Sequence, residues 1–361
     1  MTLTLDSIPI LNLYYLLCYA WDHVQERDTT KLAGLEGLST AQDLLGKVLA
    51  SGVNHLWRRG LDRGYVERRE DLVGIRGKLS ASETAKRVLR ARGRAACDFE
   101  ELSVDIQPNQ ILRSSLHGLL RHSIPLHSKV SGEVRSAYRR LSSVSLTDVG
   151  QSAFGEVRLG SDRRLYRFLL SVCRLIYENS LIEERSGQVT FRDFRRDEAT
   201  MWKIFEKFTK GFYEREQGAY KVNRGGRFIQ WADMKDDTIR ALIPKMEADL
   251  ILESSERRII MDTKYYTDAL SRGPDSRTSK LRSGHLYQLL AYLRNRQDTQ
   301  PNGAKHEGIL LYPEVGEPLR SDIQLEGFRI QARTVNLNQD WRLIHREMLS
   351  TIGLDQFGRA E

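Results

Sequence analysis

The segment MEADLILESSERRIIMDTKYY, residues 246–266, constrains the fold of this chain more than any other. Two apolar runs of strand length flank the polar turn SSER, which predicts an antiparallel hairpin within a buried sheet. Asp249, Asp262 and Lys264 interrupt these runs at the open end of the hairpin. Because burying charged groups in a sheet is costly, their presence there raises the question of what they do.

The turn decides which of these charges meet. If Ser255 and Glu256 form a two-residue turn, Asp249 lies directly opposite Asp262, and such side chains are roughly 5 Å apart. Lys264 lies two residues further along and shares their face of the sheet. Ser-Glu is not a preferred turn pair, so a shifted register is the alternative.

Two carboxylates held this close repel each other, and a divalent cation removes the conflict. Hard oxygen ligands in a partly open site favour Mg²⁺ or Mn²⁺, which can polarise a phosphodiester and acidify a bound water. Lys264 would orient that water or stabilise the charge on the phosphate. The alternative is structural: Asp262 and Lys264 form an exposed ion pair, and Asp249 caps a strand.

The surrounding pattern predicts an α/β (α+β) fold. Residues 196–361 read as helix, strands, helix, strands and helix, an order that implies a mixed sheet flanked by helices. Residues 1–195 form a mixed, helix-leaning region, so the chain of 361 residues divides into 1–195 and 196–361. The expected helices are 8–21, 41–60, 108–124, 165–181, 198–216, 283–295 and 341–349.

Two of these helices carry further candidate site residues. Gln288 and Tyr292 are four residues apart and therefore share a helical face, where they could brace the lysine or contact DNA. The alternative is that Tyr292 is a core residue and Gln288 faces solvent. In the preceding helix Glu206 borders the apolar face, whereas Glu198 lies in the first turn and is explained by the helix dipole. We therefore prefer Glu206 as a third carboxylate.

Two basic segments are candidates for binding phosphate. The segment 267–284 adjoins the proposed metal site, and its cations are expected to line a DNA path: Arg272, Arg277, Lys280 and Arg282. The segment KRVLRARGR, residues 86–94, could meet DNA or an acidic partner surface, although most charge runs are solvated faces.

Composition constrains partners and compartment only broadly. The net charge of +8 favours polyanionic partners. Cys18, Cys97 and Cys173 are widely spaced and form neither a disulfide framework nor a zinc site, so a cytoplasmic location is expected. The apolar stretch 8–21 is shorter than the roughly 20 residues that span a bilayer, so we expect a buried helix and no membrane partner.

Together the motifs resemble a known family. Asp249, Asp262-Thr263-Lys264 and Gln288-x3-Tyr292 resemble the PD-(D/E)XK nuclease superfamily in its RecB-like branch, although Ala248 replaces the motif's proline. Over nearly the whole chain the sequence is similar to the McrC-like subunits of McrBC modification-dependent restriction systems. The segments that carry this likeness are 8–21, 74–116, 246–252, 259–266 and 285–293.

The resemblance implies a Mg²⁺-dependent DNA endonuclease. Asp249 and Asp262 would hold the metal with Glu206 and the main-chain carbonyl of Thr263, and Gln288 and Tyr292 would support Lys264. The N-terminal region would dock on an McrB-like AAA+ GTPase hexamer, and the substrate would be double-stranded DNA carrying modified cytosine. The chain has no G-x4-G-K-[ST] phosphate loop, so nucleotide binding is expected in the partner. The alternatives are a non-cleaving scaffold that activates a motor ring and a stand-alone repair nuclease.

Overall fold

The computed structural model describes residues 8–23, 35, 37–160, 162–182, 189–223, 228–229, 231, 242–265, 270–271, 280–297, 305–315 and 317–354. Its backbone contacts divide the chain into two compact units. Unit 1 comprises residues 1–36 and 193–361, and unit 2 comprises residues 37–192.

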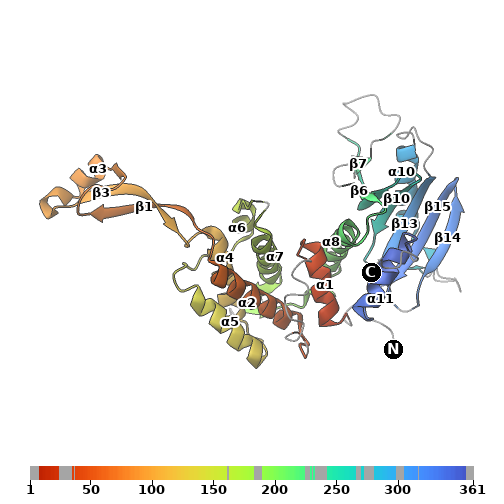
Figure 1. The fold of residues 1–361 in the computed structure, drawn as a ribbon, viewed down its shortest axis with the longest axis horizontal. Coiled ribbons are helices and arrows are strands. Elements are labelled where there is room, and N and C mark those ends of the chain that lie inside the picture. Colours follow the sequence, from red (N-terminus) through yellow and green to blue (C-terminus); the bar gives the residue numbers. More distant parts are fainter. Residues whose placement is uncertain are drawn as a thin grey trace. The chain divides into compact units, whose positions relative to one another are not determined.

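Unit 1 is organised around a six-stranded mixed sheet of order β14-β15-β13-β10-β9-β6 (Figure 1). β10, β13 and β15 are parallel, whereas β14, β9 and β6 pair antiparallel with their neighbours. The central strands are almost continuously apolar because both faces of the sheet are covered. The strands are β6 (Lys221–Val222), β9 (Leu250–Glu253), β10 (Arg257–Thr263), β13 (Lys305–Pro313), β14 (Arg320–Leu325) and β15 (Phe328–Val335).

Shorter strand pairs complete the strands of unit 1. β7 (Phe228–Ile229) pairs with β8 (Met246–Glu247), and β11 (Leu270–Ser271) pairs with β12 (Lys280–Leu281). The second pair lies in the basic segment 267–284, where Leu270 faces Leu281 and Ser271 faces Lys280.

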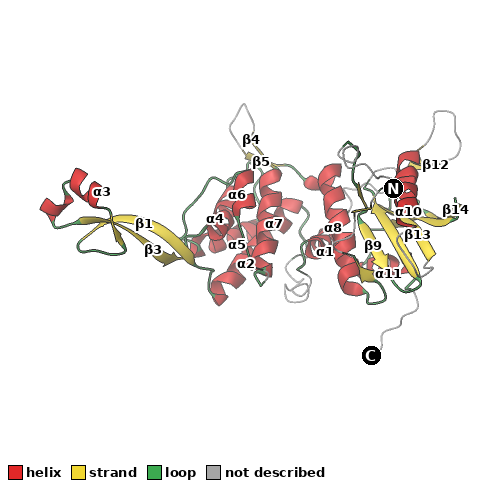
Figure 2. Cartoon of the chain, turned by 90° about the horizontal axis from the view of Figure 1, so that it is seen from above, coloured by secondary structure: helices red, strands yellow, loops and turns green. Residues whose placement is uncertain are grey.

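Unit 2 is a group of helices with an arm built on a three-stranded sheet of order β1-β3-β2 (Figure 2). In the arm β1 (Gly64–Leu72) pairs antiparallel with β3 (Ala95–Ser103) over nine residue pairs. At the far end of the arm lie β2 (Lys78–Leu79), α3 (Ala81–Lys86) and the 3-10 helix η4 (Leu89–Arg92). The remaining elements are α2 (Ala41–Arg59), α4 (Gln107–Leu119), α5 (Ser128–Arg140), α6 (Gln151–Glu156), α7 (Arg164–Glu178), β4 (Ser180–Ile182) and β5 (Val189–Phe191).

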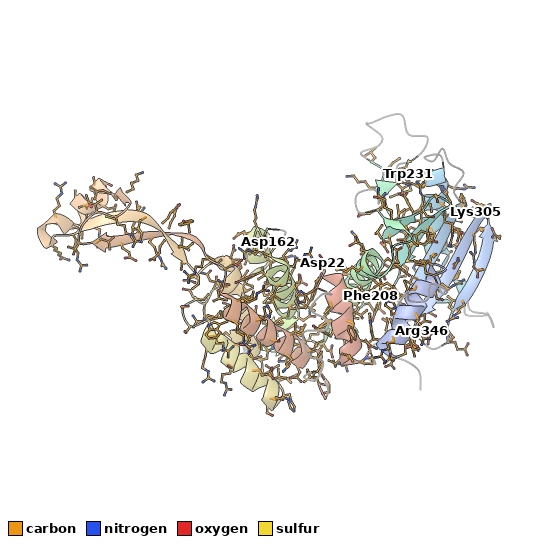
Figure 3. All side chains as sticks on the ribbon, in the orientation of Figure 1. Asp22, Asp162, Phe208, Trp231, Lys305 and Arg346 are labelled. Atoms are coloured by element: carbon orange, nitrogen blue, oxygen red, sulfur yellow. The ribbon has the colours of Figure 1, made fainter. Side chains whose placement is uncertain are left out.

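The N-terminal helix α1 (Ile10–Ala20) belongs to unit 1, contrary to the division at residue 195 that the sequence suggests. It packs against α8 (Glu198–Glu216), whose buried Phe208 is labelled in Figure 3. Gly211 permits this packing, because an added Cβ would lie 2.1 Å from the Tyr19 carbonyl oxygen. The amide of Asn12 also donates to the carbonyl oxygens of Leu337 and Gln339. The short 3-10 helix η5 (Phe194–Arg196) precedes α8.

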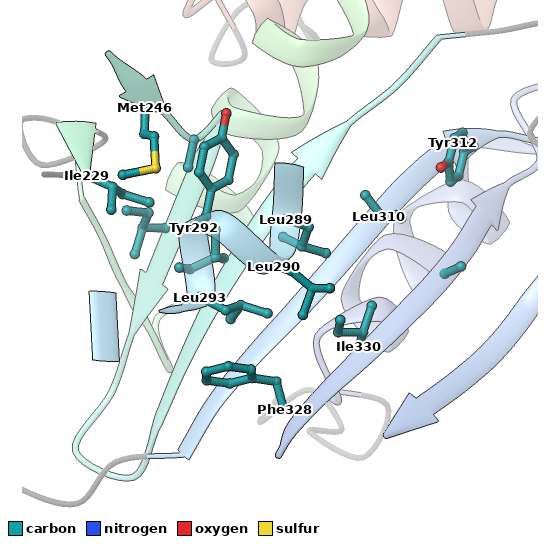
Figure 4. Close-up of a cluster of buried hydrophobic side chains, with 14 residues drawn as sticks. Ile229, Met246, Leu289, Leu290, Tyr292, Leu293, Leu310, Tyr312, Phe328 and Ile330 are labelled. Atoms are coloured by element: carbon teal, nitrogen blue, oxygen red, sulfur yellow. The ribbon is translucent and has the colours of Figure 1, made fainter. Parts of the chain in front are cut away.

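The helix α10 (Ser283–Gln297) packs on one face of the sheet. Leu289, Leu290 and Leu293 form a buried cluster with Leu310 of β13 and Ile330 of β15 (Figure 4). A glycine at position 308 allows this approach, because an added Cβ would lie 2.8 Å from Leu289 Cδ2. The helix is thereby held over β10 and β13, with Gln288 and Tyr292 near the hairpin.

The predicted mixed sheet flanked by helices is confirmed, and the expected helices are present with small shifts of their ends. The last of them, α11 (Trp341–Thr351), contacts β15. β14 and α5 were not predicted. Among the described residues no helix is long and apolar enough to cross a bilayer.

Candidate active site

The hairpin has the register that a Ser255-Glu256 turn requires. Arg258 faces Glu253 and Met261 faces Leu250, so the next pair in the same register is Asp249 and Asp262. The N–H of Ser254 donates to the carbonyl oxygen of Arg257 at 2.8 Å. The Ser254 hydroxyl also accepts from the N–H of Arg257 at 3.0 Å. Ser254 therefore stabilises this two-residue turn, although its central residues, Ser255 and Glu256, are not a preferred turn pair.

Asp249 directly precedes β9 and its carboxylate replaces a strand partner. Its Oδ2 accepts hydrogen bonds from the Thr263 N–H and from Thr263 Oγ1, each at 2.7 Å. Thr263 lies beyond the last residue of β10 that pairs with β9. Since a buried N–H needs a partner, Asp249 supplies the acceptor that β9 no longer provides.

Asp262 is buried, with only 1% of the residue exposed. Its Oδ2 is 2.8 Å from Lys264 Nζ. Burial, followed by the charge of Asp249, raises the pKa of Asp262 to about 6, although Lys264 acts in the opposite direction. The two carboxylates therefore lie close enough to repel each other, and the lysine offsets this repulsion only in part.

A chain of hydrogen bonds anchors Lys264 to α10. Lys264 Nζ donates to Gln288 Oε1 at 3.0 Å, and Gln288 Nε2 donates to the Tyr292 hydroxyl at 2.7 Å. That hydroxyl donates to the Glu247 carbonyl oxygen at 3.0 Å, and burial raises the pKa of Tyr292 to about 12. Gln288 is exposed and Tyr292 belongs to the buried cluster, and the Gln288 amide joins the lysine to this tyrosine.

The helix α8 places two side chains beside the hairpin. The indole N–H of Trp202 donates to the Thr263 carbonyl oxygen at 3.2 Å. Glu206, one helical turn further on, contributes to the raised pKa of Asp262 and is therefore the α8 carboxylate near the site. Glu198 is exposed in the first turn. Trp202 was not predicted as a site residue, although it lies four residues before Glu206 and therefore on the same helical face.

His285 also lies near Lys264. Its Nδ1 is 3.0 Å from the hydroxyl of Tyr312, a buried residue of β13. Burial, followed by the charges of Lys264 and Arg282, lowers the pKa of His285 to about 4, so the imidazole is neutral at physiological pH. The tyrosine contact holds this neutral ring on the first turns of α10.

The four cations predicted to line a DNA path lie in a segment that the structure describes only in part. Arg272 and Arg277 lie outside the described residues. Lys280 lies in β12, and its side chain is not described. Arg282 is half-buried directly before α10. Of the four cations, Arg282 alone has a described side chain, and its charge acts on His285.

The donor set fits a hard cation bound mainly through water. Among the described residues no three His, Cys, Asp or Glu side chains form a ready-made metal cage. Mg²⁺ does not require one, because it usually takes one or two carboxylates and keeps several waters. Asp249 and Asp262 would supply those carboxylates and the Thr263 carbonyl a third oxygen, and burial, followed by the charge of Asp249, raises the pKa of Asp262.

We predict that Asp262→Asn stabilises the metal-free protein at pH 8. A carboxyl group whose pKa is raised on folding destabilises the fold once it ionises, so the penalty is absent below pH 3.8 and complete above about pH 6. Removing it should contribute about 1–3 kcal/mol. Thermal unfolding with a chelator present should show a higher Tm for the variant at pH 8 and a smaller difference at pH 5.

Asp322→Asn provides the matched control in the same sheet. Hydrogen bonding to Arg333 lowers the pKa of Asp322, so its carboxylate stabilises the fold above the unfolded pKa. Neutralising it should leave the Tm unchanged or lower it. A lower Tm for Asp262→Asn than for the unmodified protein at pH 8 would contradict the electrostatic analysis of the site.

Comparison with known proteins places the chain in a family. The model of the McrBC 5-methylcytosine restriction system component matches residues 11–313. The type IV methyl-directed restriction enzyme EcoKMcrBC of Escherichia coli (strain K12) is 35% identical over 343 residues, which cover 95% of this chain and 96% of that protein. The fold resembles a chain of the half-complex of Thermococcus gammatolerans McrB AAA+ hexamers with bound McrC, with a TM-score of 0.55, 16% identity and coverage of 95% and 75%. This chain therefore belongs to the family of McrBC 5-methylcytosine restriction system components.

Proposed function

We propose that this chain is the DNA endonuclease subunit of a methyl-directed restriction complex and that it hydrolyses phosphodiesters with the help of Mg²⁺ or Mn²⁺. The contact of Lys264 with Asp262, beside Asp249 at the end of the hairpin, is the observation that carries the proposal. Restriction as the broader activity is supported by the relative from Escherichia coli, whose name describes a methyl-directed restriction enzyme.

In this proposal Asp249, Asp262 and the Thr263 carbonyl hold the cation, and Glu206 completes the negative surroundings. When bound, the ion supplies a Lewis acid that polarises the phosphate and acidifies water. Lys264 Nζ, fixed between Asp262 and Gln288, is placed to hold the attacking water and to offset charge on the phosphate oxygens. The buried Asp262 would be neutralised by the cation rather than by a proton.

Gln288 and Tyr292 determine where the ammonium group of Lys264 lies. A Lys side chain has three donors on a flexible stem, so its ammonium needs fixed acceptors to stay at one position. Asp262 provides one acceptor and Gln288 the other. Tyr292 in turn fixes the Gln288 amide. Its hydroxyl accepts a hydrogen bond from Gln288 Nε2 and donates one to the backbone carbonyl oxygen of Glu247.

The arm of unit 2 is the surface that we propose for docking on an AAA+ GTPase ring. Its far end exposes Ile75 and Val88, which are 70% and 63% exposed. Val88 has a φ of 51°, a left-handed conformation that is costly for a β-branched residue. Exposed apolar groups on a strained backbone fit a surface that another protein covers. The related structure contains McrB AAA+ hexamers with bound McrC.

The first test is cleavage of duplex DNA carrying 5-methylcytosine, with Mg²⁺, GTP and the AAA+ protein encoded with this chain. The unmodified protein should cut, whereas Asp262→Asn and Lys264→Ala should lose at least a hundredfold in rate because each removes an essential charge. Asp322→Asn, in the same sheet, should cut normally. Retained cleavage by the Asp262 or Lys264 variant would defeat the assignment.

The same assay separates cutting from activation. Measuring phosphate release from GTP in parallel shows whether the chain stimulates its partner. A wild-type chain that accelerates GTP hydrolysis but never cuts would favour the scaffold function over the endonuclease. Asp262→Asn and Lys264→Ala are expected to keep their effect on GTP hydrolysis.

Tyr292→Phe should lower the cleavage rate about tenfold, because the Gln288 amide loses its partner and Lys264 becomes less fixed. The apparent affinity for DNA should change little, since the hydroxyl is buried behind Gln288. Tyr287→Phe is the matched control, because Tyr287 lies on the same helix and is 67% exposed. Equal rates for the Tyr292 variant and the unmodified protein would remove the hydrogen-bond chain from the mechanism.

Ile75→Asp and Val88→Asp should abolish stimulation of the partner's GTP hydrolysis, because a charge at the end of the arm opposes apolar contact. Leu146→Asp is the control, since it changes another exposed aliphatic residue of unit 2 that lies outside the arm. Binding measured by analytical ultracentrifugation should fall in the arm variants only. Unchanged stimulation in both arm variants would place the docking surface elsewhere.

A further inference from the structure

Thr263 is fully buried near the end of β10. On the side of β10 that faces away from β13, no strand residue that the structure describes pairs with it. The neighbouring Lys264 N–H donates to Leu311 O of β13 at 2.9 Å. Because consecutive residues of a strand direct their peptide groups to opposite sides, the N–H and C=O of Thr263 are directed away from β13. β9 ends its pairing with β10 at Met261, so both groups must be satisfied by side chains.

Two side chains take this role. Asp249 accepts the Thr263 N–H, and the Trp202 indole donates to the Thr263 carbonyl oxygen at 3.2 Å. Both backbone groups of Thr263 are therefore held by residues that are far from it in the sequence. One of them, Asp249, is already part of the proposed cation site.

Core packing does not account for the position of Trp202. The buried face of α8 is formed by residues such as Met201, Phe205 and Phe208, whereas Trp202 is 38% exposed. A large ring at the edge of a helix contributes less buried area than one in the core. Its single polar group instead reaches the carbonyl that lies between Asp262 and Lys264 in the chain.

We propose that Trp202 is a positioning residue of the candidate active site, whose indole N–H orients the Thr263 carbonyl as a cation ligand beside Asp249 and Asp262. This inference rests on the proposed function. A carbonyl oxygen has two lone pairs, so one N–H donor leaves the second lone pair for the cation. A carbonyl that is already oriented loses less freedom when the ion binds, and partners of this kind commonly determine metal affinity.

Trp202→Phe tests the proposal because it keeps an aromatic ring and removes the N–H. Trp231→Phe is a closely matched control: Trp231, labelled in Figure 3, is also 38% exposed, and its indole donates to the Pro244 carbonyl oxygen at 3.1 Å. Both variants lose one indole–carbonyl hydrogen bond at the surface of unit 1. Pro244 is not a candidate ligand, so only the first variant should affect the cation.

The measurement is binding of Mn²⁺ to the full chain without DNA or partner, followed by the electron paramagnetic resonance signal of the free ion. Trp202→Phe should weaken the affinity about three- to tenfold, as expected for the loss of one orienting hydrogen bond. Trp231→Phe should bind like the unmodified protein, and Asp262→Asn should lose the site. At saturating Mn²⁺ the cleavage rate of Trp202→Phe should return close to normal, because its defect lies in affinity.

The outcomes separate this inference from the proposed function. Unchanged affinity in Trp202→Phe, with the site lost in Asp262→Asn, overturns the role of Trp202 and leaves the nuclease assignment standing. Equal Mn²⁺ binding by the unmodified protein and Asp262→Asn overturns the cation site itself. Trp202→His keeps a ring N–H and should retain more affinity than Trp202→Phe, so equal losses in the two variants would also overturn the role of the N–H.

Discussion

The pairing of β9 with β10 ends at Leu250 and Met261, so the next residues to face each other across the hairpin are Asp249 and Asp262. One carboxylate takes the place of a backbone acceptor for Thr263, and the other is left beside it in a buried position. Burial, followed by the charge of Asp249, raises the pKa of Asp262 and makes the site costly while it is ionised. Lys264 offsets part of this negative charge, and Gln288 and Trp202 hold groups next to it.

Two helices that are distant from the hairpin in the sequence support that point. α10 reaches it because Gly308 lets Leu289 approach the sheet, and its Gln288 then meets Lys264. α8, which precedes the hairpin in the sequence, places Trp202 against the Thr263 carbonyl. The positions of the carboxylates, the ammonium and the main-chain oxygen therefore depend on packed secondary structure rather than on loops, which favours a fixed geometry.

Each unit contains one feature that lowers the stability of the folded chain. Ionised Asp262 lowers stability in unit 1, and the left-handed Val88 is strained at the exposed end of the arm in unit 2. Such costs are typical of functional positions and are offset when a ligand or partner binds. Under the proposed function the cation offsets the first and the AAA+ ring covers the second. Under this proposal, each feature serves binding of the cation or of the ring, which is why neither improves the folding of the chain by itself.

Much of the local structure followed from the sequence. The alternation of apolar residues in 246–266 determined the hairpin, and a two-residue turn at Ser255 and Glu256 predicted that Asp249 opposes Asp262, a register that the structure confirms. The spacing of four residues likewise placed Gln288 and Tyr292 on one helical face. These patterns are local, so they do not depend on the arrangement of distant segments.

Only the tertiary structure decided which distant groups meet. The packing of α1 on α8 depends on the contact of Gly211 with the Tyr19 backbone, and no periodicity in 8–21 indicates its partner. Trp202 became a candidate site residue because the sheet ends where the Thr263 carbonyl needs a donor. The sequence by itself determined the hairpin and the chemistry of its carboxylates, because both depend on the local pattern of residues, whereas the structure decided the register that places Asp249 opposite Asp262. The donors around the carboxylates were decided by which buried polar groups still needed a partner once the elements had packed.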